Sequence, residues 1–453
     1  MTGGFRATFG TLVEVLSAAP QACASIGEDA RISGVTTDTR TVQPGDLFVA
    51  LTGETFDGHD FAAQAIAKEA IAAVVKKGAL PEDANFPCLV VDDTLAAYQA
   101  LGRWWRQQCG LPVIAITGSV GKTTTKELVA AALSQFGSVV KTQANYNNEI
   151  GVPKTLLSIR TDHDYAVVEM GMRGLEEIAL LTQIAQPTVG LITNVGTAHI
   201  GRLGSREAIA QAKCELLREL PEASTAVLNY ENSLLLSTAA NVWSGQQITY
   251  GLTGGDVQGD IRGDALIVSG VEIPLPLPGR HNALNLLGAI ATLKALNLDW
   301  QKLASGLSVS MPAGRSKFHQ LSSDIVLLDE TYNAGTEAMI AAIQLLADQP
   351  GKRRIAVLGT MKELGDQSVE LHGQVGKAVH EKGIDLLFTL ADPAEANAML
   401  KGASSVPSQQ FESHESLAKH LKETMTEGDR ILFKASRSVE MDKVVDRLLA
   451  SRG

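Results

Sequence analysis

The residues from Thr117 to Thr124 have the types and the spacing that phosphate binding requires. They follow a short apolar run, 113–116, and lead into a segment with apolar residues at helical spacing. Glycines in such a loop let backbone N–H groups point at phosphate oxygens, and the N-terminus of the following helix adds positive potential. We therefore predict a mononucleotide site at Gly118, Ser119, Val120, Gly121, Lys122, Thr123 and Thr124.

Lys122 and Thr123 have separate roles in this prediction. The Lys122 ammonium would reach the β- and γ-phosphates, and the Thr123 hydroxyl would bind Mg²⁺. The common pattern G-x-x-x-x-G-K-[ST] has a glycine where this chain has Ile116, so the loop is a short form of that pattern. The alternative is a glycine-rich turn with an incidental lysine, which the strand and the helix in register on either side disfavour.

Three further side chains could take part in phosphoryl chemistry. Glu169 ends the apolar run 165–168, and ligands of open α/β sheets gather at the carboxyl ends of strands. Its carboxylate is a candidate Mg²⁺ ligand, the alternative being a glutamate exposed at a sheet edge. His199 follows the run 189–193 through a loop of small residues, and taken alone it reads as a structural histidine. By helical pattern alone, Lys213 is a solvated charge.

The elements that must position these residues alternate between short β-rich runs and longer helical patterns. This order predicts parallel sheets with crossover helices. The 453 residues are enough for two to four domains at roughly 100–200 residues each. We predict an α/β chain of three domains, with a central mostly parallel sheet that carries the phosphate loop, a smaller α/β N-terminal domain and a Rossmann-like C-terminal domain.

Glycine and proline mark the predicted domain boundaries. The first lies at Cys109-Gly110-Leu111-Pro112, after a helix predicted over 98–108, and the second lies at the linker 310–314. The domains are therefore 1–108, 109–312 and 313–453. The predicted strands are 46–51, 70–75, 87–91, 113–116, 165–169, 189–193, 226–229, 325–328, 354–358, 385–389 and 430–433, with edge strands within 251–278.

Composition excludes several classes of protein. Hydrophobic residues make up 45% and charged residues 20%, as is usual for soluble globular proteins. The net charge is −11 and no basic stripe is present, so nucleic acid is not expected as a partner. No apolar run approaches the ~18–20 residues that span a bilayer, and Glu14 interrupts the apolar stretch 9–24. We expect no membrane insertion and a cytoplasmic location.

The four cysteines do not form a recognisable framework. Cys23, Cys88, Cys109 and Cys214 lie far apart and include no C-x-x-C pair. This spacing fits neither a zinc site nor a set of disulfides. We expect buried thiols in a reducing compartment.

Taken in order, the motifs of this chain resemble those of the Mur ligases over nearly its whole length. Within the family the resemblance is to the type that adds D-alanyl-D-alanine to UDP-N-acetylmuramoyl-tripeptide. The short phosphate loop is the family's normal form. The other motifs are the segments 37–40, 44–51, 145–153, 169–171, 193–199, 279–282, 329–334, 358–365 and 434–438.

The resemblance implies roles in ATP and metal binding. Glu169 and His199 would bind Mg²⁺, of which two ions are expected. Lys213 matches a lysine that can be carbamylated in this family, which would make it a ligand of the second ion. His281 and Asn282 would lie near the adenine, Asp329 would hold the ribose, and Arg315 would reach the phosphates from the third domain.

The resemblance also implies where the other substrates bind and that the protein is a monomer. The uridine-diphosphate end of the first substrate would lie on Thr37, Asp38, Thr39 and Arg40, and Asn147 is assigned to substrate binding as well. The dipeptide side is assigned to Asn333, Lys434, Ser436 and Arg437. Two positions depart from the family pattern: Gly335-Thr336 lies where a proline-containing segment is usual, and Thr360 lies where an acid is common.

Other activities remain open at this point. A folylpolyglutamate synthase lacks a domain with the Thr37–Arg40 segment, and the ligase that adds diaminopimelate or lysine carries an Asn-Pro-Arg motif that is absent here. From a different class, a P-loop NTPase switch or assembly factor would couple hydrolysis to a protein partner. Stimulation of phosphate release by small carboxylate substrates separates that class from a ligase.

Overall fold

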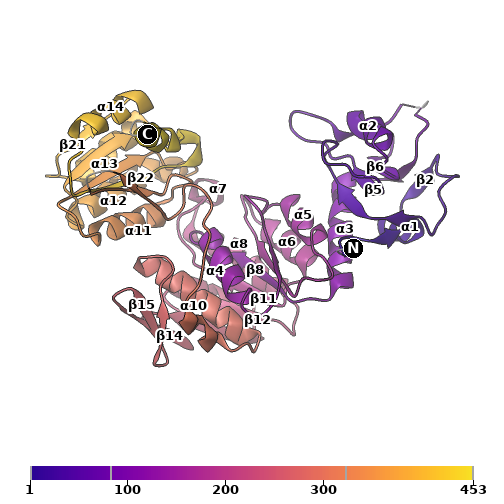
Figure 1. Cartoon of the computed structure of the whole chain (residues 1–453), viewed down its shortest axis with the longest axis horizontal. Coiled ribbons are helices and arrows are strands. Elements are labelled where there is room, and N and C mark those ends of the chain that lie inside the picture. Colours follow the sequence, from indigo (N-terminus) through magenta and orange to yellow (C-terminus); the bar gives the residue numbers. More distant parts are fainter. Residues whose placement is uncertain (1–2, 82–83, 322–323, 451–453) are drawn as a thin grey trace.

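The computed structural model describes residues 3–81, 84–321 and 324–450. The described chain forms three sheet-based units that follow one another in sequence, with the central unit between the other two (Figure 1). The α/β class with largely parallel sheets is therefore confirmed. The outermost residues of the predicted first and last domains, 1–2 and 451–453, lie outside the described residues.

The N-terminal unit is a five-stranded sheet in the order β2-β7-β6-β5-β4, parallel except for β2. A separate antiparallel pair, β1 and β3, lies beside it. The sheet strands are β2 (Ala19–Gln21), β4 (Gly34–Thr36), β5 (Asp46–Val49), β6 (Ala72–Lys76) and β7 (Cys88–Val91). The other elements are β1 (Ala7–Thr8), α1 (Phe9–Leu16), β3 (Arg31–Ile32) and α2 (Ala62–Ala67).

Helix α3 (Thr94–Cys109) joins this unit to the next one. Asp93 caps its N-terminus, and Gly110 ends it in the left-handed conformation at φ 64°. The helix packs on α1 and β6 on one side and on α5 and α6 of the central unit on the other. Two of its side chains bind the central unit: Trp105 Nε1 donates to the Ile159 carbonyl at 2.9 Å, and Arg106 Nε donates to the Ala185 carbonyl at 2.9 Å.

The central unit is a nine-stranded sheet in the order β16-β15-β14-β13-β12-β11-β8-β10-β9. Its strands run parallel from β9 to β14, and β15 and β16 complete the edge antiparallel. The strands are β8 (Val113–Thr117), β9 (Val139–Lys141), β10 (Tyr165–Glu169), β11 (Val189–Ile192), β12 (Thr225–Asn229), β13 (Gln246–Gly251), β14 (Val257–Arg262), β15 (Ala265–Val268) and β16 (Val271–Pro274). The helices are α4 (Lys122–Leu133), α5 (Gly151–Leu157), α6 (Glu177–Ala185), α7 (Ile200–Leu203), α8 (Arg206–Arg218), α9 (Ser233–Ala239) and α10 (Arg280–Ala295).

Strand order explains where the central unit can bind a ligand. After β8 the chain forms β9 and β10 on one side of β8 and then crosses to β11 on the other. Such a switch in direction leaves a crevice at the carboxyl ends of the strands, where ligands of open α/β sheets bind. The loop after β8 opens into that crevice, flanked by the ends of β10 and β11.

The C-terminal unit is a six-stranded sheet in the order β17-β18-β22-β19-β20-β21, parallel except for β17. Its strands are β17 (Lys317–Leu321), β18 (Ile325–Asp329), β19 (Arg353–Gly359), β20 (Leu386–Leu390), β21 (Ser408–Gln410) and β22 (Asp429–Lys434). Its helices are α11 (Thr336–Ala347), α12 (Ser368–Glu381), α13 (Pro393–Gly402), α14 (His414–Thr424) and α15 (Asp442–Ala450).

Burial follows the layers of each unit. Buried apolar side chains of α4 and α10 cover one face of the central sheet, while those of α5, α6 and α8 cover the other.

All four cysteines are free; Cys88 and Cys214 are buried, and Cys23 and Cys109 are partly buried. No helix in the described part of the chain combines the length and the apolar character that crossing a membrane requires.

Candidate active site

The phosphate loop joins β8 to α4 and is shaped by two glycines. Gly118 has φ 148° and Gly121 has φ 87°, values that side-chain-bearing residues rarely adopt. Helix α4 begins at Lys122, whose Nζ turns back to donate to the Gly118 carbonyl at 2.7 Å. Burial lowers the pKa of Lys122, and the nearby Glu169 opposes that shift. The amine is therefore held over the loop, where phosphate oxygens would lie.

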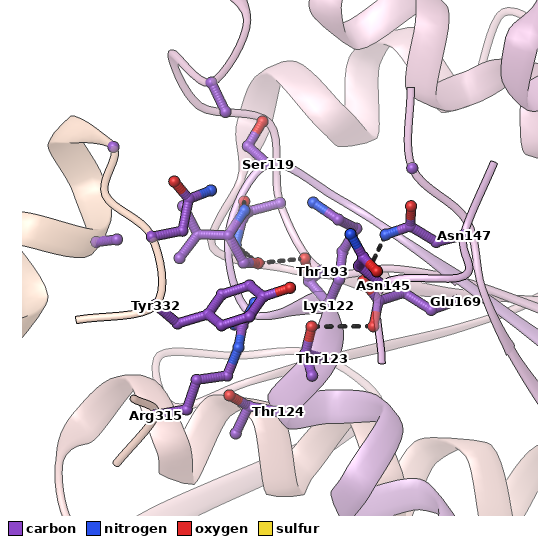
Figure 2. Close-up of a pocket in the computed structure, with 18 of the residues that line it drawn as sticks. Ser119, Lys122, Thr123, Thr124, Asn145, Asn147, Glu169, Thr193, Arg315 and Tyr332 are labelled. Atoms are coloured by element: carbon purple, nitrogen blue, oxygen red, sulfur yellow. Dashed lines mark hydrogen bonds between the residues drawn. The ribbon is translucent and has the colours of Figure 1, made fainter. Parts of the chain in front are cut away.

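Residues after β11 hold the loop in this shape. The Asn194 side chain accepts from the Val120 N–H at 2.9 Å, and the Asn194 carbonyl accepts from the Ser119 N–H at 3.1 Å. Thr193 Oγ1 donates to the Val120 carbonyl at 2.6 Å, one of the dashed contacts in Figure 2. These hydrogen bonds restrain the loop backbone, and a restrained loop loses less entropy when it binds a nucleotide.

Alanine at Gly118 is expected to destabilise the fold and weaken nucleotide binding together. A Cβ there would lie 1.9 Å from Thr193 Oγ1, and the φ of 148° is strained for any other residue. The strain alone costs about 1–3 kcal/mol. Gly263→Ala is the control, because Gly263 also has positive φ (58°) but its Cβ would meet nothing within 4 Å.

Thermal unfolding and binding of a non-hydrolysable ATP analogue measure the two effects. Gly118→Ala should lower both the midpoint and the affinity, whereas Gly263→Ala should change only the midpoint. Unchanged nucleotide affinity in Gly118→Ala would contradict the assignment of this loop.

Glu169, at the end of β10, lies beside the start of α4. It is 3% exposed; one carboxylate oxygen accepts from Thr123 Oγ1 and the other from Asn147 Nδ2, both at 2.9 Å (Figure 2). The 2.9 Å between Thr123 Oγ1 and Glu169 Oε2 matches the edge of an octahedron with bonds of about 2.1 Å, the length that Mg²⁺ prefers. These two oxygens therefore fit one Mg²⁺ shell.

The remaining donors of such a shell do not come from a cluster of protein ligands. Among the described residues, no three His, Cys, Asp or Glu side chains converge on one point. This arrangement is usual for Mg²⁺ that is held by one or two protein oxygens together with phosphate oxygens and water.

His199 and Lys213 also lie near Lys122 at the phosphate loop. His199 precedes α7 in the left-handed conformation, with φ 67°. Burial lowers its pKa, and the nearby Lys122 adds to the shift. Lys213, in α8, is 1% exposed, and burial with the nearby Lys122 holds its pKa well below the usual value. The interpretation of Lys213 as a solvated charge is therefore wrong, although the side chain does not line the cleft itself.

The start of α10 forms the nucleotide side of the crevice. Asn282 is 2% exposed and donates from Nδ2 to the Pro278 carbonyl at 2.8 Å, while burial lowers the pKa of His281. Asn285, which we did not predict, lies one turn further and accepts from Thr125 Oγ1 at 3.2 Å. Its position three residues after Asn282 on the same helix was the available signal.

The C-terminal unit faces this crevice with a second set of polar side chains. The Arg315 guanidinium stacks on the Tyr332 ring at 4.0 Å, and in Figure 2 both reach toward Lys122. Arg315 Nε is buried without a hydrogen-bond partner among the described residues. Lys434 Nζ donates to the Asn333 carbonyl at 3.0 Å, and burial lowers the pKa of Lys434. Because Arg315 lines the same cleft as Lys122, its guanidinium is suited to an anionic ligand there.

Several predicted residues lie outside the cleft. Asp329 is buried and accepts from Thr331 Oγ1 at 2.6 Å, while its neighbour Glu330, which we did not predict, lines the cleft instead. Ser436 Oγ accepts from the Lys362 N–H at 2.9 Å. Arg437 pairs with Asp442 at 2.9 Å.

The cleft between the central and C-terminal units has a volume of about 820 Å³. It is lined by the phosphate loop, Glu169, His199 and the start of α10, and from the other side by Arg315 and the segment 332–335. Gly335, which departs from the family pattern, is the N-cap residue of α11 and has an extended conformation with φ −151°. The segment 37–40 belongs to the N-terminal unit and is not part of this lining.

The segment 37–40 has its own internal contacts. Arg40 binds Asp38 through both carboxylate oxygens and lowers the pKa of Asp38 to about 2. The nearby Lys154 of α5 adds to that shift. Thr39 Oγ1 donates to Gln64 Oε1 at 3.1 Å. Thr37 directly follows the last residue of β4 in the sequence.

The chain matches three family descriptions in the order of its sheet-based units. They are the Mur ligase family catalytic domain over residues 31–102, the Mur ligase middle domain over 116–293 and the Mur ligase glutamate ligase domain over 314–437. Among curated proteins, the UDP-N-acetylmuramoyl-tripeptide--D-alanyl-D-alanine ligase of Synechocystis sp. is 56% identical, with 94% of each chain covered. The Escherichia coli protein of the same name is 38% identical, with 93% of this chain and 95% of that one covered.

Comparison with solved structures also places the chain among the Mur ligases. MurF from Acinetobacter baumannii superposes with a TM-score of 0.88 at 32% identity, covering 99% of this chain and 100% of that one. MurF from Thermotoga maritima in complex with ADP superposes with a TM-score of 0.80 at 29% identity, covering 93% and 98%. The resemblance that the motifs indicate is confirmed over nearly the full length, and the chain belongs to the Mur ligase family.

Proposed function

We propose that this protein is an ATP-dependent ligase that joins D-alanyl-D-alanine to UDP-N-acetylmuramoyl-tripeptide, the last cytoplasmic peptide-adding step of peptidoglycan precursor synthesis. The observation that carries this proposal is a phosphate loop facing a cleft whose opposite wall, with Arg315 and Lys434, comes from another sheet-based unit. The two relatives with this name cover 94% and 93% of this chain, and the structure of MurF from Thermotoga maritima is a complex with ADP.

Each unit has one task in this proposal. Residues 1–108 bind the UDP-linked substrate through Thr37, Asp38, Thr39 and Arg40. Residues 109–312 bind ATP, with His281 and Asn282 near the adenine. Residues 313–453 bind the amino substrate through Asn333, Lys434, Ser436 and Arg437, and complete the nucleotide site with Arg315 and Asp329. We propose that the protein acts as a monomer.

The reaction then has two steps. A carboxylate oxygen of the tripeptide attacks the γ-phosphorus of ATP, the bond to the β,γ-bridging oxygen breaks, and ADP and an acyl phosphate result. The dipeptide amine attacks the acyl carbon, loses a proton, and expels phosphate as the peptide bond forms. Lys122 and Arg315 stabilise the charge on the transferring group. The docked C-terminal unit excludes water, which would hydrolyse the acyl phosphate.

The metal ligands of this proposal are Thr123, Glu169, His199 and Lys213, with two Mg²⁺ ions. When bound, Mg²⁺ would neutralise phosphate charge in the transition state. Lys213 would contribute as a carbamate: its neutral amine adds to CO₂, and loss of one proton leaves a carboxylate-like group. The low pKa of the buried amine supports this step, because only the unprotonated amine is a nucleophile.

Phosphate release from ATP and Mg²⁺ tests the proposal. We expect release with UDP-N-acetylmuramoyl-tripeptide and D-alanyl-D-alanine together, and the pentapeptide product by mass. Little release is expected when either substrate is omitted, since the acyl phosphate needs the first and turnover needs the second. Release that is indifferent to both substrates would leave an ATPase of this family with a different carboxylate and amine.

A further inference from the structure

Two carboxylates of the C-terminal unit bind the loop that carries His199. Glu337, in the first turn of α11, accepts from the Thr197 N–H at 2.8 Å and from Thr197 Oγ1 at 3.0 Å. Glu363, in the loop after β19, lies 2.5 Å from His199 Nδ1 through its Oε2 and 3.4 Å from Arg202 Nη2 through its Oε1. Only Glu363 contacts the imidazole.

The backbone fixes Glu363 at this place. Its carbonyl accepts from the Gly201 N–H at 3.0 Å, and its own φ of 65° is in the left-handed region. Gly201 and Gly365 pack so closely that a Cβ on Gly201 would lie 2.4 Å from the Gly365 nitrogen. The carboxylate is therefore brought to His199 by a close backbone contact between two units, not by a free side chain on the surface.

The His199 ring is oriented for two partners. Its Nδ1 is buried and lies against the Glu363 carboxylate, although no described residue makes a well-directed hydrogen bond to Nδ1. The side chain is still 26% exposed and lines the cleft, which leaves Nε2, on the far side of the ring, as the nitrogen available to a ligand. Metal-binding histidines usually donate their other N–H to a carboxylate, which fixes the tautomer.

We propose that Glu363 is a positioning residue for His199: it accepts the Nδ1 proton and presents Nε2 to the second Mg²⁺, so that this metal site is complete only when the C-terminal unit is docked. The inference rests on the proposed metal role of His199. It adds that metal affinity and domain docking are linked, because the carboxylate and the imidazole belong to different units.

Mn²⁺ binding to the full chain, followed by electron paramagnetic resonance in the presence of a non-hydrolysable ATP analogue, tests this without turnover. Glu363→Gln should weaken one of the two bound Mn²⁺ ions about 10–100-fold, the usual effect of losing such a partner. Glu337→Gln is the matched control: it removes the charge of the other docking carboxylate and leaves the imidazole contact, while the glutamine amide oxygen can still accept from the Thr197 N–H and keep the unit docked. Its Mn²⁺ affinity should stay close to that of the parent.

The outcomes separate the inference from the proposed function. If the parent and His199→Ala bind Mn²⁺ identically, His199 is no ligand and the metal assignment itself fails. If His199→Ala loses an ion but Glu363→Gln matches the parent, or binds Mn²⁺ more tightly, the positioning role is wrong. Nitrogen-15 spectra of His199 add a second readout: the Nδ1–H tautomer should dominate in the parent and decline in Glu363→Gln, and equal spectra would contradict the role.

Discussion

Replacing Lys122 with methionine is expected to lower substrate-dependent phosphate release about a thousandfold while leaving the thermal midpoint of the ligand-free protein unchanged or raised. The loss is of the order seen when a charge that stabilises a transferring phosphoryl group is removed. Methionine keeps the length and the apolar stem of the side chain, so the effect isolates the ammonium. A simultaneous measurement of turnover and thermal unfolding checks both halves of the expectation.

The expected stability follows from the surroundings of Lys122. The side chain is partly buried, and its pKa is lowered first by desolvation and then by the positive charge of Arg315. Its hydrogen bond goes to the carbonyl of Gly118, and within residues 3–81, 84–321 and 324–450 no carboxylate pairs with it directly. Without phosphate nearby, this partly desolvated charge contributes little to folding, and replacing such a charge with an apolar group of similar size is often neutral or stabilising.

Lys126, one turn along α4, provides the contrast. It is more deeply buried than Lys122, at 1% exposed, and it donates to the Thr142 carbonyl at 2.9 Å and pairs with Glu127 at 3.0 Å. Lys126→Met should therefore lower the midpoint clearly, because it leaves buried acceptors without this donor. A midpoint loss in Lys122→Met as large as in Lys126→Met, or phosphate release at the parent level, would count against the role given to Lys122.

The strands that could be predicted are the ones buried on both faces. The runs that became β5, β8, β10, β11 and β19 are almost wholly buried, and parallel strands covered by helices read as continuous apolar segments. We did not predict β13 or β17, whose residues are largely exposed or half-buried and include polar side chains. Their pairing depends on neighbours in the sheet, which no local pattern reveals.

The residues of the candidate site also differ in whether their local sequence reveals their role. The phosphate loop is contained in eight consecutive residues between a strand and a helix, so its chemistry is visible locally. Lys213 shows the opposite case: its helical position resembles that of a surface lysine, and only the resemblance to a family gave it a role before the structure showed its burial. Glu363 lies more than a hundred residues from His199, and nothing in its local sequence indicates that contact.

Lys213→Ala is expected to lower turnover on the order of a hundredfold, as when one stabilising group of a charged transition state is removed, and to abolish any dependence on bicarbonate. In the parent protein, activity should fall in buffer stripped of CO₂ and return when bicarbonate is added. The surface variant Lys377→Ala, whose side chain is 70% exposed, should respond to bicarbonate as the parent does. Phosphate release with both substrates, measured across bicarbonate concentrations at fixed pH, checks these expectations.

The direction of the pKa shift makes this experiment decisive at neutral pH. An ordinary lysine is almost entirely protonated there and cannot add to CO₂, whereas burial and the neighbouring charge of Lys122 favour the neutral amine of Lys213. Carbamylation replaces a buried amine with an anion beside Lys122, so the modified side chain relieves the repulsion that lowers the pKa. Full activity of Lys213→Ala without bicarbonate would mean that the second ion needs no carbamate, and the buried amine would then have only a structural role.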